Sequence, residues 1–341
     1  MHSLVALGAV TGGINLPISA AELRELGLTP GGYTEVSVDR MEKLRLALET
    51  SRGKLPNPNS GGSVANTADL LARAGISCGF MGVGGDDTFG RAFVSNFERA
   101  SLEFLSELET GAVTGYDFYL YSDDGVRTIV LTHGANSLLS PARIDIEAIK
   151  GADLVLLDGM ALDFGPESEA AMVRCVQAAE EQGIPLVLTL ASTKVVDSHR
   201  AFFDTVGPKA QMVAGNLEQA AVLVGLEPEA SLDEVRVELA KTSIDAVVTL
   251  DADGAFARFG DKEFLLPTQK IEAVDTTGAG DSFLAAFLVA RVKGLSVRQA
   301  LAVGNVIAGE VVQHQGARLP INLDIPGLMQ EAIQIAASLD D

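Results

Sequence analysis

The sequence of 341 residues contains no tryptophan, two cysteines and few basic residues. Its 25 lysines and arginines are outnumbered by 46 aspartates and glutamates, which gives a formal net charge of −21. Such an acidic surface excludes broad contact with nucleic acid or anionic lipid, because both need basic residues to neutralise phosphate groups. A few backbone amides can still bind a small anion. We therefore expect a small-molecule ligand, no nucleic acid and no membrane.

The two cysteines, Cys78 and Cys175, are too far apart in the sequence for a metal or redox motif. We expect two buried free thiols, as is usual in the reducing cytoplasm. No apolar run reaches the length of about 18 residues that a membrane span needs. The first residues also lack the basic segment of a signal peptide. A cytoplasmic protein is therefore expected, and a hydrophobic content of 47% is ample for a large core.

Two common nucleotide-binding motifs are also missing. No Gly-Lys pair is followed by Ser or Thr, so the sequence has no Walker A loop. Gly82-Val83-Gly84 lacks the third glycine of a dinucleotide-binding fingerprint. Any nucleotide site must therefore be built in another way.

Short apolar runs alternate with longer amphipathic stretches along the chain. This pattern predicts an α/β protein in which helices cover both faces of a mostly parallel sheet. Strands are expected at residues 4–10, 79–83, 154–157, 185–190 and 246–250, and helices at 65–74, 89–100, 168–181 and 282–292.

Two stretches depart from this alternation. Residues 32–38 have β character beside a Gly-Gly turn, and residues 114–132 alternate around a hairpin turn at Ser122–Gly125. Such strands suit a small accessory sheet, which we expect to act as a lid over a crevice at the carboxyl ends of the parallel strands. The lid is expected to be formed by two inserted segments, about 12–40 and 112–134. Its apolar outer face is suited to pair two subunits, so a homodimer through the lid is a further expectation.

The most informative segment is Gly278-Ala279-Gly280-Asp281, which precedes an apolar helix. Small residues at the start of a helix let its free amides approach and bind an anion. Asp281 is the carboxylate of this turn, and the helix dipole is expected to keep it ionised and able to accept a proton. An anion hole beside a base is what phosphorylation of a hydroxyl group requires. The alternative is that this aspartate merely caps the helix.

Four segments resemble a known family. Asp275–Phe283 resembles the C-terminal signature of the PfkB, or ribokinase-like, carbohydrate kinases. Gly61–Ala68 resembles the N-terminal signature, and Gly79–Gly90 resembles the Gly-x-Val-Gly-x-Asp-x-x-Gly segment that follows it. Asp124–Thr128 resembles the hairpin of the adenosine-kinase-like branch. The resemblance implies a single catalytic domain over the whole chain, with a three-layer fold of central sheet, flanking helices and small β lid.

The resemblance also implies an activity. It is that of an ATP-dependent kinase that transfers the γ-phosphoryl group to a hydroxyl, expected to be a primary one, of a small sugar or nucleoside. Asp281 would be the base, and Gly278, Ala279 and Gly280 would form the anion hole. ATP and Mg²⁺ are the implied cofactors, with K⁺ as a further ion. The implied sites are Thr249, Asp251, Gly254, Thr277, Asn305 and Ala308 for the nucleotide, Gly13, Asn15, Gly61, Gly62, Asn66 and Arg127 for the acceptor, and Asp275 and Asn216 for metal.

Three positions depart from the family's pattern. The aspartate that grips acceptor hydroxyls in the family is replaced by Gly13, with Asn15 and Thr11 as the polar residues nearby. The Asn-x-x-Glu motif ends in Gln219, so an amide replaces a carboxylate near the metal. Asp251 stands where a glycine is usual beside the nucleotide.

These departures leave two hypotheses open. The first is an active kinase with an acceptor unlike ribose or fructose, favoured because Asp281 is kept beside its glycines. The second is a catalytically weak protein with a kinase fold that binds a nucleotide or metabolite as a sensor. The acceptor also stays open, because the hairpin favours a nucleoside-like compound whereas the missing aspartate disfavours a ribose diol. Arg127 is the one basic residue that the sequence places near the acceptor, and His314 is expected to pack beside the nucleotide pocket or within the core.

Overall fold

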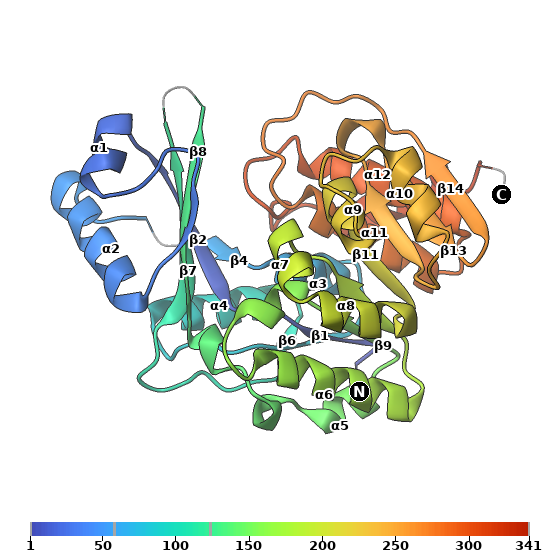
Figure 1. Ribbon diagram of the computed structural model, residues 1–341, viewed down its shortest axis with the longest axis horizontal. Helices are drawn as coiled ribbons and strands as arrows, with labels where there is room; N and C mark the ends of the chain where they lie inside the picture. The colour runs from blue at the N-terminus through green and yellow to red at the C-terminus, as the bar shows by residue number, and fades with distance from the viewer. Residues whose placement is uncertain (1, 57–58, 123–124, 340–341) are drawn as a thin grey trace.

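The computed structural model describes residues 2–56, 59–122 and 125–339, which form two sheets and their covering helices (Figure 1). The larger sheet has nine strands, and neighbouring strands from β6 to β12 run parallel, whereas β12, β13 and β14 are antiparallel. In spatial order its strands are β14 (Lys262–Leu266), β13 (Ala255–Phe259), β12 (Ala246–Thr249), β11 (Met212–Asn216), β10 (Leu186–Thr189), β9 (Leu154–Leu157), β1 (Leu4–Leu7), β5 (Cys78–Met81) and β6 (Glu103–Phe104).

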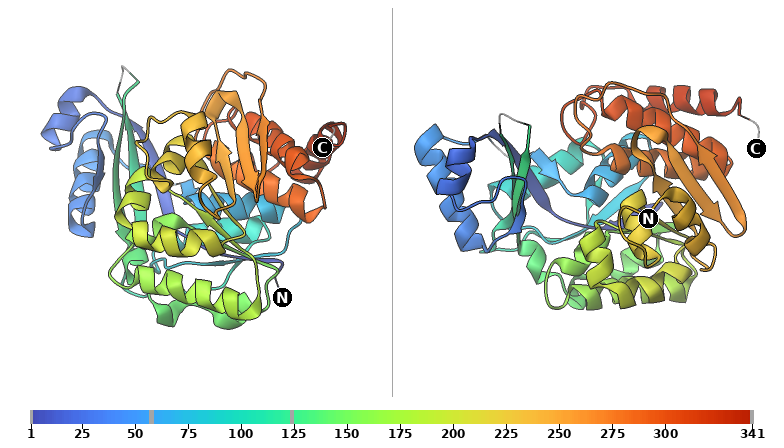
Figure 2. Two further views of the ribbon diagram at one scale, coloured as in Figure 1. Left: turned by 45° about the vertical axis from the view of Figure 1, so that its right-hand side comes forward. Right: turned by 45° about the horizontal axis from the view of Figure 1, so that its top comes forward.

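Helices cover both faces of this sheet (Figure 2). All four residues of β1 are buried, but Leu4 and Ala6 belong to one core and Val5 and Leu7 to the other, because successive side chains of a strand point to opposite faces. The first core is built with α3 (Ser63–Arg73), α4 (Thr88–Arg99), α11 (Ala279–Val292), α12 (Val297–Val311) and α13 (Ile325–Ala336). The second is built with α5 (Ile146–Lys150), α6 (Ser168–Gln182), α7 (Thr193–Ser198), α8 (Arg200–Val206), α9 (Leu217–Leu223) and α10 (Leu232–Leu239).

The smaller sheet has five strands and stands beside the main body (Figure 1). Its helices α1 (Ala20–Glu25) and α2 (Val38–Arg52) cover the outer face, where their apolar residues join those of the strands in a third core. The opposite face is turned toward the main body. In spatial order the strands are β3 (Tyr33–Glu35), β8 (Arg127–Gly134), β7 (Thr114–Tyr121), β2 (Thr11–Pro17) and β4 (Asn59–Gly61). Short 3₁₀ helices lie at Ala135–Leu138 (η1), Pro141–Arg143 (η2), Gly159–Asp163 (η3), Gly207–Lys209 (η4) and Asp251–Asp253 (η5).

The predicted α/β class, with a mostly parallel sheet between helices, is confirmed. The strand expected at 4–10 is shorter, because β1 ends at Leu7 and the chain crosses to the second sheet at Thr11. At this crossing the Asn136 side chain accepts from the Val10 amide at 3.0 Å and donates to the Val10 carbonyl at 2.9 Å. These two bonds replace the pairing that a continued strand would have made.

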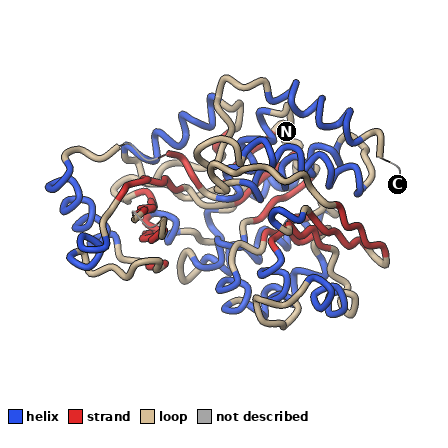
Figure 3. The backbone as a smooth tube through the Cα atoms, turned by 90° about the horizontal axis from the view of Figure 1, so that it is seen from above, coloured by secondary structure: helices blue, strands red, loops and turns tan. Residues whose placement is uncertain are grey.

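Two further expectations stay predictions. Residues 123 and 124 of the expected hairpin turn lie outside the described residues, although β7 and β8 pair antiparallel on either side of it. The outer face of the small sheet is covered by α1 and α2 of the same chain, and the homodimer expected through the lid stays a prediction. Figure 3 shows these two helices at the end of the molecule that the small sheet forms.

The structure also bears on the two cysteines and on the lack of long apolar runs noted in the sequence. Cys78 and Cys175 are free and buried, as predicted, and burial raises the pKa of each thiol to about 12. Within the described ranges, no helix combines the length and the apolarity needed to cross a membrane.

Candidate active site

Two cavities meet at the start of α11. The first, of about 640 Å³, lies against the inner face of the five-stranded sheet, and we call it the acceptor cavity. The second, of about 550 Å³, lies at the ends of β11 and β12 beside α11 and α12, and we call it the nucleotide cavity. Ser63, Ala191 and Asp281 line both. The two cavities therefore share one carboxylate.

Asp281 is held by the helix that packs against its own. Ser63 Oγ donates to Oδ1 at 2.6 Å, and Asn66 Nδ2 donates to Oδ2 at 2.8 Å, both from α3. Burial raises the pKa of Asp281, while these two hydrogen bonds and the charge of Arg318 lower it. The balance is a raised pKa, so burial outweighs the helix dipole that was expected to keep the group ionised. A raised pKa makes the carboxylate a stronger proton acceptor once it is ionised.

A chain of charged groups continues from Asn66. Its Oδ1 accepts from Arg318 Nε at 2.8 Å, and Arg318 Nη1 also donates to Asp69 Oδ1 at 3.2 Å. Arg73 lies on the other side of Asp69, at 3.7 Å from its Oδ2. Burial lowers the pKa of Arg318. Asn66, which was expected to hold the acceptor, lines the acceptor cavity, and each end of its amide makes one hydrogen bond to a protein group.

The turn before α11 needs a glycine at position 278. Gly278 has φ 79°, which L residues rarely adopt, and a Cβ atom there would lie 2.2 Å from the carbonyl oxygen of Ala317. Within the described chain, the amides of Gly280 and Asp281 have no protein acceptor, and that of Ala279 makes only a long bond of 3.3 Å to Thr276. These three residues line the nucleotide cavity, whereas Gly278 lines neither cavity. The free amides are thus those of Gly280 and Asp281, and Gly278 sets the turn.

Asp275 ties the same turn to the segment before Arg318. Its Oδ1 accepts from the Thr277 amide and its Oδ2 from the Gly316 amide, each at 2.9 Å. Burial acts to raise the pKa of Asp275, but these hydrogen bonds and the charge of Arg127 hold it below its usual range. Thr277 lines the acceptor cavity rather than the nucleotide cavity where it was expected.

The nucleotide cavity collects most of the residues expected there. Asn216 also lines it and caps α9, accepting from the Gln219 amide at 2.9 Å. Gln219 Oε1 accepts from the Asn216 amide at 3.1 Å, and its Nε2 donates to the Ala191 carbonyl at 2.9 Å. The departure at 219 therefore completes a capping box. Other predicted residues lining this cavity are Thr249, Asp251, Gly254, Asn305 and Ala308.

The acceptor cavity contains carboxylates that sequence reasoning missed. Asp158 is 1% exposed, and its Oδ2 has no hydrogen-bond partner in the described part of the protein. Burial, with a smaller effect from the charge of Asp281, raises the pKa of Asp158 to about 6. Asp117 lines the cavity from β7. Three basic residues also line the cavity, namely Arg73, Arg99 and Arg318. Arg127, which was predicted to contact the acceptor, does not line it. The other residues predicted there do line it: Gly13, Asn15, Gly61 and Gly62.

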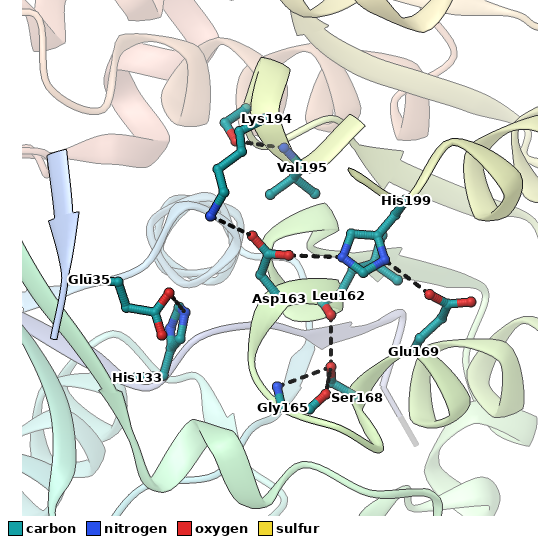
Figure 4. A network of polar contacts seen from close by, with 11 residues as sticks. Glu35, His133, Leu162, Asp163, Gly165, Ser168, Glu169, Lys194, Val195 and His199 are labelled. Carbon is teal, nitrogen blue, oxygen red and sulfur yellow. Dashed lines mark hydrogen bonds and ion pairs between the residues drawn. The ribbon is translucent and has the colours of Figure 1, made fainter. Parts of the chain in front are cut away.

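A polar network lies beside the acceptor cavity (Figure 4). His199 bridges two carboxylates, with Nε2 at 2.8 Å from Asp163 Oδ1 and Nδ1 at 3.0 Å from Glu169 Oε2. Lys194 Nζ lies 3.6 Å from the other oxygen of Asp163. Burial lowers the pKa of His199, but the two carboxylates outweigh burial and raise it. The imidazole of His199 thus joins η3, α6 and α7.

This network predicts a pH-dependent stability. A raised pKa means that protonated His199 stabilises the fold fully below its unfolded pKa of about 6.5, and that this stability is lost as the pH rises through the folded pKa. We expect the melting temperature of the wild type to fall by a few degrees more than that of His199→Gln between pH 6 and pH 8.5. The control is His314→Gln, because the imidazole of His314 contacts one carboxylate, that of Glu310 at 3.1 Å, rather than bridging two. Equal slopes for all three proteins would contradict this role of His199.

Comparisons with known proteins identify the family and the fold. The sequence model "pfkB family carbohydrate kinase" matches residues 32–323. The 5-dehydro-2-deoxygluconokinase of Shouchella clausii is 29% identical over 283 residues, which are 80% of this chain and 86% of that protein. The structure of adenosine kinase from Sinorhizobium meliloti has a TM-score of 0.85 at 24% identity, covering 97% of this chain and 99% of that one. A putative Ribokinase II from E. coli, in complex with ATP and Mg²⁺, has a TM-score of 0.76 at 18% identity, covering 97% and 100%.

The two structures share the ribokinase-like fold with this protein, so the fold expected from the sequence is confirmed. The family match spans most of the chain, including the small sheet from β3 onward and the turn before α11. The chain belongs to the pfkB family of carbohydrate kinases, phosphotransferases that act on an alcohol group.

Proposed function

We propose that the protein transfers the γ-phosphoryl group of ATP to a primary hydroxyl of a small sugar or nucleoside bound in the acceptor cavity. The observation that carries this proposal is that Asp281 lines both cavities. A base at the junction can reach the acceptor hydroxyl on one side, while the phosphoryl group arrives from the other. In-line transfer needs this arrangement.

Asp281 takes the proton of the acceptor hydroxyl while the oxygen of that hydroxyl attacks the γ-phosphorus of ATP. Ser63 and Asn66 hold the two carboxylate oxygens in place, so little reorganisation is needed during the reaction. Negative charge gathers on the transferring group, where the amides of Gly280 and Asp281 can donate to it. Arg127, which is exposed on the hairpin and whose charge acts on Asp275, is a further donor to the phosphate or acceptor when the small sheet closes as a lid.

The nucleotide cavity fits an ATP that brings its own metal. Among the described residues, no group of three or more His, Cys, Asp or Glu side chains could hold a metal ion. Mg²⁺ is commonly bound by substrate phosphates, water and one or two protein oxygens, so this sparse donor set fits it. Asn216 and Asp251 are the proposed contacts on that side, and Mg²⁺ would neutralise charge on the phosphates. K⁺ is proposed near Asp275, whose low pKa keeps it ionised.

The test is an assay of ADP formation with ATP and MgCl₂. The acceptors are ribose, adenosine and 5-dehydro-2-deoxygluconate, the compounds suggested by the names of the relatives, and ATP alone is the blank. We expect at least one acceptor to raise ADP formation about 100-fold or more above the blank, since positioning and electrostatics contribute effects of this size. Binding of ATP without stimulation by any acceptor would contradict the proposal and favour a nucleotide sensor.

A further inference from the structure

The inner face of the five-stranded sheet presents one carboxylate to the acceptor cavity, that of Asp117. Along β7, Tyr116, Phe118 and Leu120 are buried in the outer core. The residues between them, Asp117 and Tyr119, therefore point to the opposite face, and both line the cavity.

The neighbouring strand leaves room for this carboxylate. Strands β2 and β7 run side by side in parallel (Figure 1), and Gly13 is the residue paired with Asp117. A Cβ atom at Gly13 would lie 2.7 Å from Cε2 of Tyr119, so the tyrosine ring occupies the place of a side chain at residue 13. Strand β2 thus has no carboxylate at residue 13, and Asp117 on the paired strand β7 supplies one at the same position of the sheet.

Asp117 has hydroxyl partners but no cation. The Tyr119 hydroxyl donates to Oδ2 at 3.3 Å, and the Thr11 hydroxyl is a second donor. Burial raises the pKa of Asp117 to about 7, and no positive charge in the described part of the chain lowers it. A carboxylate can accept about four hydrogen bonds, so Asp117 can accept further hydrogen bonds from a molecule in the cavity. A ligand that donates hydrogen bonds would satisfy these free positions, whereas an anionic group would be repelled.

The geometry points to Asp117 as the residue that selects the acceptor, by accepting hydrogen bonds from two adjacent hydroxyl groups of a sugar or nucleoside. This inference rests on the proposed kinase function and names its substrate class, a compound with a vicinal diol at the end held by β2 and β7. Two carboxylate oxygens suit two neighbouring O–H donors. A compound that lacks one hydroxyl leaves a buried carboxyl oxygen unpaired and is rejected more strongly than a change of size would explain.

The test uses the wild type and Asp117→Asn in the ADP assay, with the three acceptors named above, each of which carries adjacent hydroxyl groups. Asp117→Asn is expected to raise the acceptor KM about 10- to 100-fold, because hydrogen bonds to a charged group are lost, while kcat stays within about threefold. Asp39→Asn is the matched control, since it removes an exposed carboxylate in the first turn of α2, on the covered side of the same sheet. It is expected to leave both constants unchanged.

A second comparison varies the acceptor instead of the protein and then repeats the measurement with Asp117→Asn. The wild type is expected to use ribose or adenosine about 10-fold better in kcat/KM than 2-deoxyribose or 2′-deoxyadenosine, and Asp117→Asn to narrow this gap. Thermal unfolding of Asp117→Asn is the check that the variant is folded. An unchanged KM in a folded Asp117→Asn, or equal use of the deoxy compounds by the wild type, would overturn the inference and leave the kinase function standing. If no acceptor is phosphorylated, the proposed function itself fails.

Discussion

Asp281→Asn is expected to lower kcat by about 10³-fold or more, because a positioned base contributes an effect of this size. The amide cannot take the acceptor proton, although its oxygen can still accept from Asn66 Nδ2, which now donates to Oδ2 at 2.8 Å. The KM for ATP is expected to stay within about threefold, since the rest of the nucleotide cavity is unchanged. Steady-state kinetics with saturating acceptor measures both constants.

Ser63→Ala is the matched control for this variant. It removes the hydrogen bond at 2.6 Å but keeps the carboxylate, so kcat is expected to fall by no more than about tenfold. Because that hydrogen bond lowers the pKa of Asp281, its loss raises the pKa further, and the acidic limb of the kcat/KM profile moves to higher pH. Turnover by Asp281→Asn within about tenfold of the wild type would refute the assignment of the base.

Gly278→Ala is expected to lower both the stability and the activity of the protein, and its loss of activity is expected to be second in size to that of Asp281→Asn. An alanine at φ 79° is strained, and its Cβ would lie 2.2 Å from the Ala317 carbonyl, so the turn and the 316–318 segment must separate. We expect a destabilisation of about 2–4 kcal/mol. Because the free amides of Gly280 and Asp281 would move with the turn, kcat is expected to fall about 100-fold. Denaturant unfolding and the ADP assay measure the two effects.

Gly280→Ala separates backbone strain from the mere addition of a methyl group. Gly280 lies in the first turn of α11, its φ is not positive, and a Cβ atom there would have no heavy atom within 4 Å. Its unfolding free energy is expected to equal that of the wild type or to rise slightly, since alanine favours the helix. If both alanine variants unfold alike, the special conformation of residue 278 does not matter to the fold.

The architecture was predictable where local patterns carry it. Alternating apolar runs located β9 and α11 and gave the parallel sheet between helices, because such strands are buried on both faces. Helix α2 was missed, since only Met41, Leu44 and Leu48 of its 15 residues are buried and this stripe is too narrow to stand out among charged neighbours. The end of β1 could not be predicted either, because it depends on Asn136, far along the chain.

The candidate site also has parts that could be predicted from the sequence and parts that could not. The turn before α11 and Asp281 could be identified from adjacent residues, because a helix start carries its chemistry locally. The partners of Asp281 could not, since Ser63 is 218 positions away and the bond between Asn66 and Arg318 spans 252 positions. Asp117 was overlooked because its importance lies in the register of β2 against β7, although the alternation along 114–132 already put it on one face with Tyr119.

The wide separation of these partners along the chain has a consequence during synthesis. Ser63 leaves the ribosome long before Asp281, and Arg318, which steadies Asn66, emerges later still. A nascent polypeptide that stops short of residue 318 would therefore carry a base without its full set of supports. ATP turnover would then begin only after residue 318 has been translated, so shorter nascent chains would not consume ATP.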